Sequence, residues 1–244
     1  MRLLILGGIV ALQRGDSPHA ESRLEAALAQ ARQLGDGSSE AQALIVLGGC
    51  KLEAGKLEEA ASLCEESAVA YDRIGDPSGF SNAIAMLGEI AFQRGEYGEA
   101  VSRFEEALSL KRQTQDAEIA YVLVGLARLA LVREDVEEAM LHAREALRTA
   151  SRTGIGPHLA AALNIVARSV AAANDPERAT RLFSASETLS KEVGGVVLRA
   201  GNAERARTIA AVRETLGDAR FDELCRLGAA MSAEDAAEYA LAEN

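Results

Sequence analysis

The sequence has little of the residues that build β-sheets, disulfide frameworks or sharp breaks. It contains no Trp, four Tyr and five Phe, three Cys and four Pro. Aromatic and β-branched residues are the preferred strand formers, so their scarcity excludes a β-sandwich or β-barrel. Three irregularly spaced cysteines exclude a disulfide framework and a zinc site and fit a reducing cytoplasm. Few prolines leave room for long helices.

Positive charge is also scarce. The 26 Lys and Arg face 37 Asp and Glu, so the formal net charge is −11 at pH 7. Such a chain repels nucleic-acid phosphates and anionic lipid, and we expect neither as a partner. The sequence has no run of about 18 consecutive apolar residues, the length that a membrane-spanning helix needs. The apolar run Leu3 to Leu12 resembles a short signal peptide but reaches no small-x-small cleavage site. A cytoplasmic location is therefore expected.

Alanine is abundant, with 48 residues in a chain of 244. Because Ala is the best helix former, an all-α fold is expected. A repeat of about 40 residues runs along the chain, a period typical of helical solenoids. Its register is carried by three recurring positions: Gly8, Gly48 and Gly88; Gly15, Gly55 and Gly95; Ala20, Ala60 and Ala100.

Each repeat is predicted to be a helical hairpin. Apolar residues recur at helical spacing from Ala83 to Ala91 and again from Ala100 to Leu108, with Arg94-Gly95-Glu96 between them. Five such units are expected at residues 1–36, 37–76, 77–116, 117–155 and 156–195. They make up an array over residues 1–197, and a helical cap follows over residues 198–244.

Small residues and capping signals support this interpretation. Gly or Ala at the eighth and twentieth positions of each repeat lets the two helices of a hairpin approach closely. A larger residue at the twenty-fourth position fills the gap beside them. The pairs Ser17-Pro18, Asp76-Pro77 and Asp175-Pro176 place a capping side chain before a proline. Candidate C-terminal glycines are Gly35, Gly75, Gly154 and Gly194.

These positions resemble the tetratricopeptide repeat, whose helix-turn-helix signature runs from a Leu-Gly pair through an Ala to an aromatic residue. Two units match it best: Leu47-Gly48 with Ala60, and Leu87-Gly88 with Ala100 and Phe104. The leading Trp and the proline near the repeat end are missing, and the unit is longer than usual. The resemblance implies a right-handed α-α superhelix that binds proteins or peptides.

The longer unit and the tail are similar to the C-terminal regions of STAND-type signalling ATPases, including LuxR-type and MalT-like transcriptional activators. The segments that carry this resemblance are Arg178 to Glu187, Arg213 to Gly217, and Met231 to Leu241. In that family the ATPase lies elsewhere. The resemblance therefore implies a sensor or interaction region. A free-standing adaptor is the alternative, and an all-α enzyme is a third, weaker one.

The usual catalytic and metal-binding motifs are missing. The segment from Gly49 to Lys56 has the wrong spacing for a phosphate-binding loop, and no G-x-G-x-x-G, H-E-x-x-H or C-x-x-C occurs. Acidic pairs such as Glu58-Glu59 fit a solvated helix face better than acid–base catalysis. Cys50 and Cys64 occupy repeat positions inside a hairpin and are predicted to be packed thiols. We expect no enzyme, cofactor or metal site.

Binding is expected in a groove lined by the first helix of each hairpin. Projection by register gives a groove that is apolar early and polar later. The predicted groove residues are Gln42, Asn82, Glu89, Tyr121, Arg128, Asn164 and Arg168. Arg128 and Arg168 stand at the same position of successive repeats, which favours an acidic partner segment. The alternative is that both side chains are simply solvated. A protein, a peptide or a small inducer are the candidate ligands.

The first helix is expected to be apolar on nearly every side. Its own hairpin and the next one cover part of its surface, whereas terminal repeats normally present a polar outer face. Leu3, Leu6 and Val10 are therefore predicted to form a self-association surface that makes a homodimer. The alternative is a natural chain that continues upstream.

Overall fold

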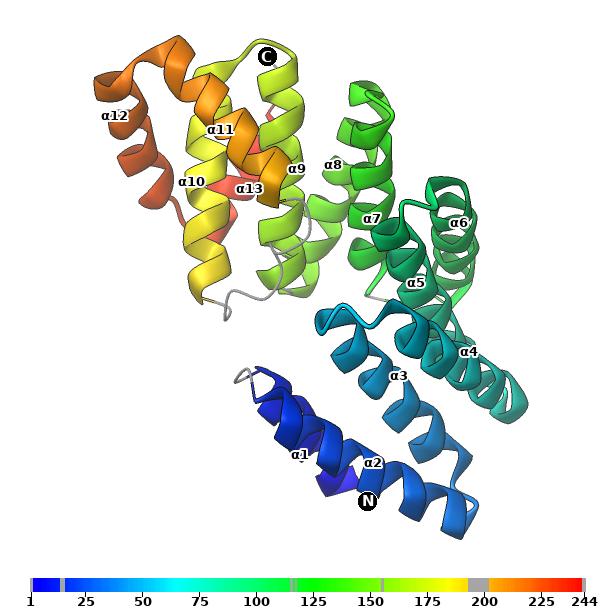
Figure 1. Ribbon diagram of the computed structural model, residues 1–244. Helices are drawn as coiled ribbons and strands as arrows, with labels where there is room; N and C mark the ends of the chain where they lie inside the picture. Colours follow the sequence, from blue (N-terminus) through cyan, green and yellow to red (C-terminus); the bar gives the residue numbers. More distant parts are fainter. Residues whose placement is uncertain are drawn as a thin grey trace. The chain divides into compact units, whose positions relative to one another are not determined.

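The computed structural model describes residues 2–13, 16–114, 116, 118–154, 156–192 and 202–242. In these residues every regular element is an α-helix, and ten of the helices pair as five consecutive hairpins (Figure 1). Their bounds are α1 Arg2–Gln13 and α2 Ser17–Leu34; α3 Gly37–Glu53 and α4 Leu57–Ile74; α5 Pro77–Arg94 and α6 Tyr97–Thr114; α7 Ile119–Val132 and α8 Val136–Thr153; α9 Gly156–Ala172 and α10 Pro176–Glu192.

Three further helices follow: α11 Asn202–Leu216, α12 Asp218–Ala229 and α13 Ala233–Leu241. The chain forms two compact units, Met1–Asp116 with α1 to α6 and Ala117–Asn244 with α7 to α13. We call them unit 1 and unit 2. The division into an array over residues 1–197 and a cap over residues 198–244 stays an interpretation.

Repeated local signals begin and end these helices. Asp36 and Asp76 accept hydrogen bonds from the backbone N–H groups three residues further on, at 3.1 and 2.9 Å, and satisfy donors that the first helical turn leaves free. The prediction for α2 was wrong in one respect: Asp16, not Ser17, is the N-cap. Its carboxylate reaches the N–H of His19, whereas Ser17 is already helical.

The predicted C-terminal glycines behave as expected where they are described. Gly35, Gly75 and Gly154 are left-handed, with φ of 67°, 68° and 70°, a conformation that glycine adopts without steric cost. Gly194 lies outside the described residues.

Close helix contacts follow the predicted size pattern. A Cβ placed on Gly8 would lie 2.6 Å from Leu24 Cγ, and one on Gly48 would lie 2.6 Å from Cys64 Sγ. On Gly88 it would lie 3.2 Å from the Phe104 ring. In each of these hairpins the side chain of the second helix fills the space that the missing Cβ leaves. A glycine here is a packing requirement rather than a break in the helix.

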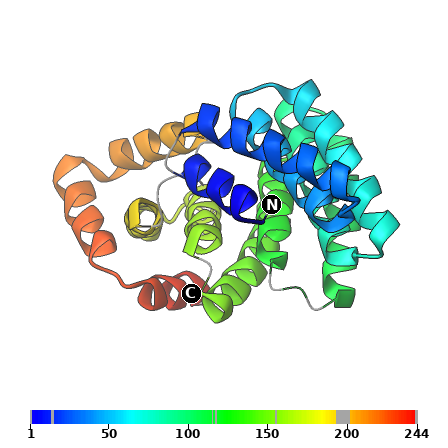
Figure 2. The same ribbon diagram turned by 90° about the horizontal axis from the view of Figure 1, so that it is seen from below.

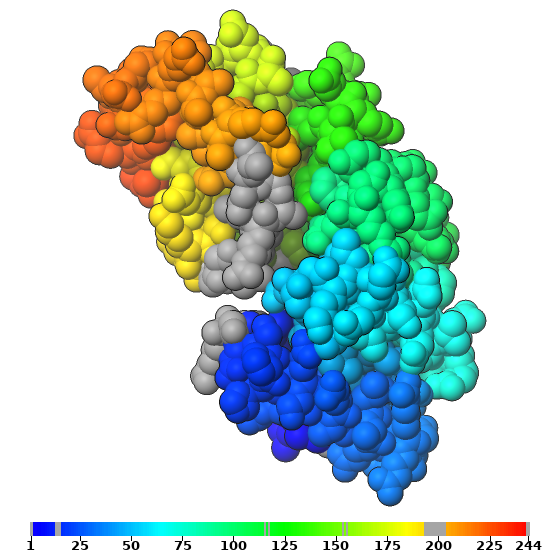
Figure 3. All heavy atoms as spheres, viewed as in Figure 1, coloured from blue at the N-terminus to red at the C-terminus, as the bar shows by residue number. Residues whose placement is uncertain are grey.

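In unit 2, α11, α12 and α13 surround α10, which is seen end-on in Figure 2. The space-filling view in Figure 3 shows α11 and α12, in orange, packed over the yellow-green α9 and yellow α10. The expected start of the last helix is confirmed: Ser232 is the N-cap of α13 and forms a capping box with Asp235. Across the described residues, no helix is long and apolar enough to cross a membrane.

Candidate functional site

The predicted groove residues of unit 1 differ in what their side chains contact. Gln42 is exposed on α3. Asn82 on α5 is half-buried, and its Oδ1 accepts a hydrogen bond of 2.6 Å from Lys111 Nζ. Glu89 is only 7% exposed, and its Oε1 accepts from Gln93 Nε2 at 3.3 Å. In this unit, therefore, neighbouring side chains already use the polar atoms of two of the three residues.

The partner of Asn82 belongs to a polar network that the sequence analysis missed. Lys111 is 1% exposed, and its ammonium also lies 2.9 Å from Asp116 Oδ2. Ser78 Oγ donates to the same carboxylate oxygen at 2.8 Å. A buried ammonium needs such compensation, because desolvation of an unpaired charge is costly. The sequence contains a signal for this network: Lys111 stands at the repeat position that Ala31 and Tyr71 occupy in the two preceding hairpins.

The predicted residues of unit 2 lie on its first helices, with Tyr121 and Arg128 on α7 and Asn164 and Arg168 on α9. All four are half-buried. The Tyr121 ring centroid lies 5.9 Å from that of His158. The Asn164 Oδ1 is buried and has no hydrogen-bond partner in the described part of the chain. This amide is therefore able to accept a bond from a ligand.

The charges of the two predicted arginines influence each other. Burial lowers the pKa of Arg168, and the like charges of Arg128 and Arg207 lower it further, while the carboxylate of Glu204 opposes them. Arg207 and Glu204 belong to α11, which packs on α9 and crosses it in Figure 1. We call Arg128, Arg168 and Arg207 the arginine cluster. One carboxylate lies among these charges, because Glu204 also forms an ion pair of 3.3 Å with Arg207.

Cys50 and Cys64 are packed in the core of unit 1. Cys50 and Cys64 are 1% and 0% exposed, and burial raises the pKa of these thiols to about 11 and about 12. A thiol that stays protonated is a poor nucleophile, so the predicted packed state is confirmed for both. No group of three or more His, Cys, Asp or Glu side chains that could hold a metal ion occurs within the described ranges.

The predicted self-association residues form one exposed face of α1. Leu3 is 82% exposed, Leu6 56% and Val10 44%, whereas Ile5 on the opposite side is 1% exposed and belongs to the core of unit 1. The spacing of three and four residues puts the three exposed side chains on one stripe. In the described part of unit 1, these three side chains make an exposed apolar face.

Stacked helical hairpins with small residues at the helix contacts define a helical-repeat interaction protein. A sequence model of the tetratricopeptide repeat matches residues 6–73 and 85–155. The chain belongs to the tetratricopeptide repeat family. The expected all-α, tetratricopeptide-like fold is confirmed, and repeats of this kind are generally non-catalytic scaffolds for protein interactions.

Several solved structures share the fold. BtubC from P. vanneervenii is 20% identical, with a TM-score of 0.63 over 86% of this chain and 90% of that one. A Rap protein complexed with competence and sporulation factor is 13% identical, with a TM-score of 0.69 over 93% of this chain and 60% of that one. PilF of Pseudomonas aeruginosa is 18% identical, with a TM-score of 0.58 over 91% and 95% of the two chains. No curated protein matches the sequence.

Proposed function

We propose that the chain is a non-catalytic interaction module that captures an acidic segment of a partner protein on unit 2. The arginine cluster carries this proposal. Two of its guanidinium groups lie one repeat apart on α7 and α9, close enough for the charge of one to lower the pKa of the other. Both guanidinium groups attract the carboxylates of an acidic segment, which competes with Glu204 for Arg168.

The neighbouring groups complete a binding surface. Tyr121 offers a ring, and the Asn164 amide offers a buried acceptor on the same helix as Arg168. The carboxylate of Glu204 raises the pKa of Arg168, which burial and the other two arginines lower, so this guanidinium favours a neighbouring negative charge. Gln42, Asn82 and Glu89 belong to the same proposed binding function on unit 1.

The test is capture of labelled oligoglutamate by the purified chain and by the variant Arg128→Glu with Arg168→Glu. We expect the variant to lose capture and to keep its helicity and melting temperature, because both side chains are partly solvated. The matched control is Arg152→Glu with Arg226→Glu, which makes the same charge change at exposed arginines of α8 and α12. Equal capture by all three proteins would contradict the proposal. Pulldown from native cell extract with the same proteins then identifies the partner.

The biological setting is also a proposal: the chain serves as the sensor and interaction region of a STAND-type, LuxR-like or MalT-like regulator in the cytoplasm. The tail segments Arg178 to Glu187 and Met231 to Leu241 support the relationship to these regulators. The three free thiols support a reducing compartment such as the cytoplasm. A nucleotide-binding domain encoded upstream in the same reading frame supports it. A complete reading frame without that domain favours the free-standing adaptor. A small inducer as ligand belongs to the first setting.

A further inference from the structure

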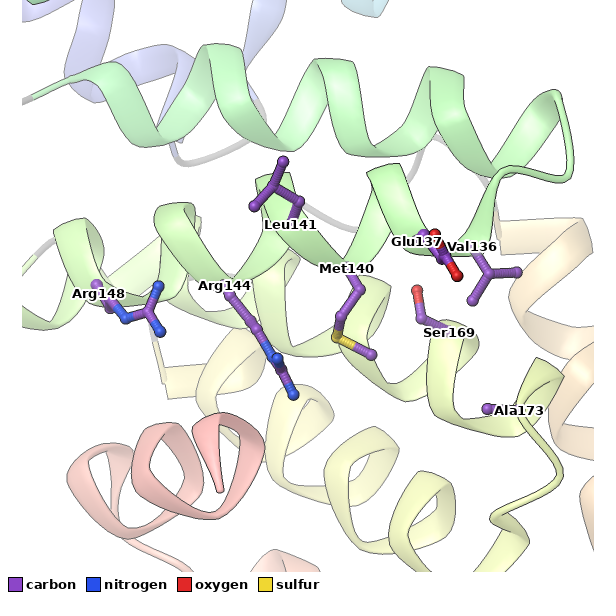
Figure 4. Close-up of a pocket in the computed structure, with 8 residues that line it drawn as sticks. All are labelled: Val136, Glu137, Met140, Leu141, Arg144, Arg148, Ser169 and Ala173. Atoms are coloured by element: carbon purple, nitrogen blue, oxygen red, sulfur yellow. The ribbon is translucent and has the colours of Figure 1, made fainter. Parts of the chain in front are cut away.

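A pocket of about 460 Å³ lies between α8 and α9 of unit 2. Figure 4 shows its lining: Val136, Glu137, Met140, Leu141, Arg144 and Arg148 from α8, with Ser169 and Ala173 from α9. Six of the lining residues come from α8, which is the second helix of its hairpin. The pocket has no residue in common with the arginine cluster. Its volume is within the range that small ligands occupy.

Two polar atoms in this lining are buried without a partner. Ser169 is 0% exposed, and neither its Oγ nor the Nε of Arg144 has a hydrogen-bond partner among the described residues. An unsatisfied buried polar atom costs free energy, so such atoms point to a group that the described residues do not supply. In Figure 4 the Ser169 hydroxyl points toward α8, and Met140 lies beside it. An unbranched Met side chain can move aside for a ligand.

The charged groups of the lining are arranged in order along α8. Glu137 stands at the end near Val136, and Arg144 and Arg148 stand toward the other end (Figure 4). Within the described ranges, none of these three side chains forms an ion pair or a side-chain hydrogen bond. The pocket thus has an unpaired negative end, an apolar middle at Met140 and an unpaired positive end.

The distance between the two ends sets the length of the ligand. Seven residues separate Glu137 from Arg144, which corresponds to about 10 Å along an α-helix. An extended peptide covers about 3.4 Å per residue, so about three residues span that distance. A free amine then meets Glu137, and a terminal carboxylate meets Arg144 and Arg148.

We propose that this pocket binds a short apolar peptide with free termini, about three residues long. The Ser169 hydroxyl donates to a peptide carbonyl, Arg144 and Arg148 hold the carboxylate, and Glu137 holds the amine. Apolar side chains of the peptide lie on Val136 and Met140. A carboxylate held by two guanidinium groups accepts charge-assisted hydrogen bonds, which are stronger than neutral ones.

Trileucine is the probe, and binding to the full chain is measured by calorimetry. We expect saturable binding that weakens by about tenfold or more when either end of the probe is blocked, as in N-acetyl-trileucine or trileucine amide. Arg144→Gln weakens trileucine binding to a similar degree but leaves the amide unaffected. Arg152→Gln on the same helix, outside the pocket, is the matched control and binds as the parent does.

Ser169→Ala separates binding from folding. Removal of an unsatisfied buried hydroxyl leaves the melting temperature unchanged or raises it, while trileucine binding weakens several-fold. Absence of saturable trileucine binding to the parent overturns the proposal, as does equal affinity of the parent and Arg144→Gln. Octanoate binding as tightly as trileucine also overturns it, because the site would then take a simple apolar acid.

Discussion

At the residue scale, helix spacing within a hairpin depends on two facing positions. Gly48 faces Cys64, and Gly88 faces Phe104. In the fourth hairpin the same register positions hold Ala127 with Ala143, and in the fifth Ala167 with Phe183. The combined size of the two facing residues therefore varies from one hairpin to the next. We expect the effect of an added methyl group on stability to differ between hairpins.

Gly48→Ala tests this directly. The new Cβ would lie 2.6 Å from Cys64 Sγ, so we expect a loss of about 1–3 kcal/mol in unfolding free energy from overpacking. In a Cys64→Ala background the clash disappears, and the better helix propensity of Ala, about 1 kcal/mol over Gly, offsets the cost. Urea unfolding of the four proteins measures the coupling. The same loss in both backgrounds would show that the two side chains do not interact.

The hairpin turns differ in which residue type has the left-handed backbone conformation. Gly55 and Gly95 have φ of 73° and 79°, but the equivalent positions of the next two hairpins are Glu134 and Asn174, with φ of 61° and 63°. A residue with a Cβ is strained in this region, and Asn less so than Glu.

Glu134→Gly is therefore expected to stabilise the protein. Relief of the left-handed strain exceeds the entropy cost of glycine, for a net gain of about 0.5–1 kcal/mol. Asn174→Gly gains less, and Gly95→Ala loses stability because it creates the strain. Thermal unfolding ranks the three variants, and a Glu134→Gly protein that melts below the parent would contradict the argument.

At the element scale, one buried side chain attaches the last helix. Arg178 on α10 is 7% exposed and donates hydrogen bonds to the carbonyls of Tyr239, Ala240 and Ala242, at 3.0, 3.3 and 2.5 Å. These carbonyls are at the C-terminal end of α13, where the helix dipole favours a cation. The guanidinium also lies 5.7 Å from the centroid of the Tyr239 ring.

Arg178→Met keeps an apolar stem but leaves three carbonyls without their donor. We expect a loss of about 3 kcal/mol or more, because hydrogen bonds to a charged group contribute about 1.5–3 kcal/mol each. Hydrogen exchange should show the amides of α13 losing protection first. Arg181→Met is the control: Arg181 lies over the same ring at 5.7 Å, and loss of that contact alone costs about 1 kcal/mol or less. Equal hydrogen-exchange protection of α13 in both variants would show that contacts other than those of Arg178 hold this helix in place.

At the scale of the whole molecule, the apolar face of α1 governs association. Leu3, Leu6 and Val10 are all exposed on one stripe, and each leucine-sized side chain contributes about 1.5–3 kcal/mol when fully buried. We expect the chain to form a homodimer through this face, and Leu3→Glu with Leu6→Glu to make it monomeric by light scattering. Val69→Glu replaces a lone exposed valine on α4, which is 69% exposed, and should leave the dimer intact. A monomeric parent at high concentration would rule the dimer out.

The sequence by itself determined the five helical hairpins and several of their helix ends, although α2 is capped by Asp16 and not by the predicted Ser17. Those features depend on contacts within a few residues: apolar spacing, the carboxylates of Asp36 and Asp76, and glycines such as Gly75 at helix ends. It also determined the facing pairs such as Gly48 and Cys64, because a fixed repeat length makes distant positions equivalent.

Tertiary structure alone decided which polar side chains are already used and which are left over. Register placed Asn82 in the groove, but the buried Lys111 on a neighbouring helix binds its amide. Arg178 lies in a tail segment for which the sequence offered only a family resemblance, yet its hydrogen bonds reach residues more than 60 positions away. The Ser169 hydroxyl, which has no hydrogen-bond partner among the described residues, likewise depends on how α8 packs on α9. The physical reason is that helix formation is local, whereas the burial and pairing of a polar group depend on every helix that surrounds it.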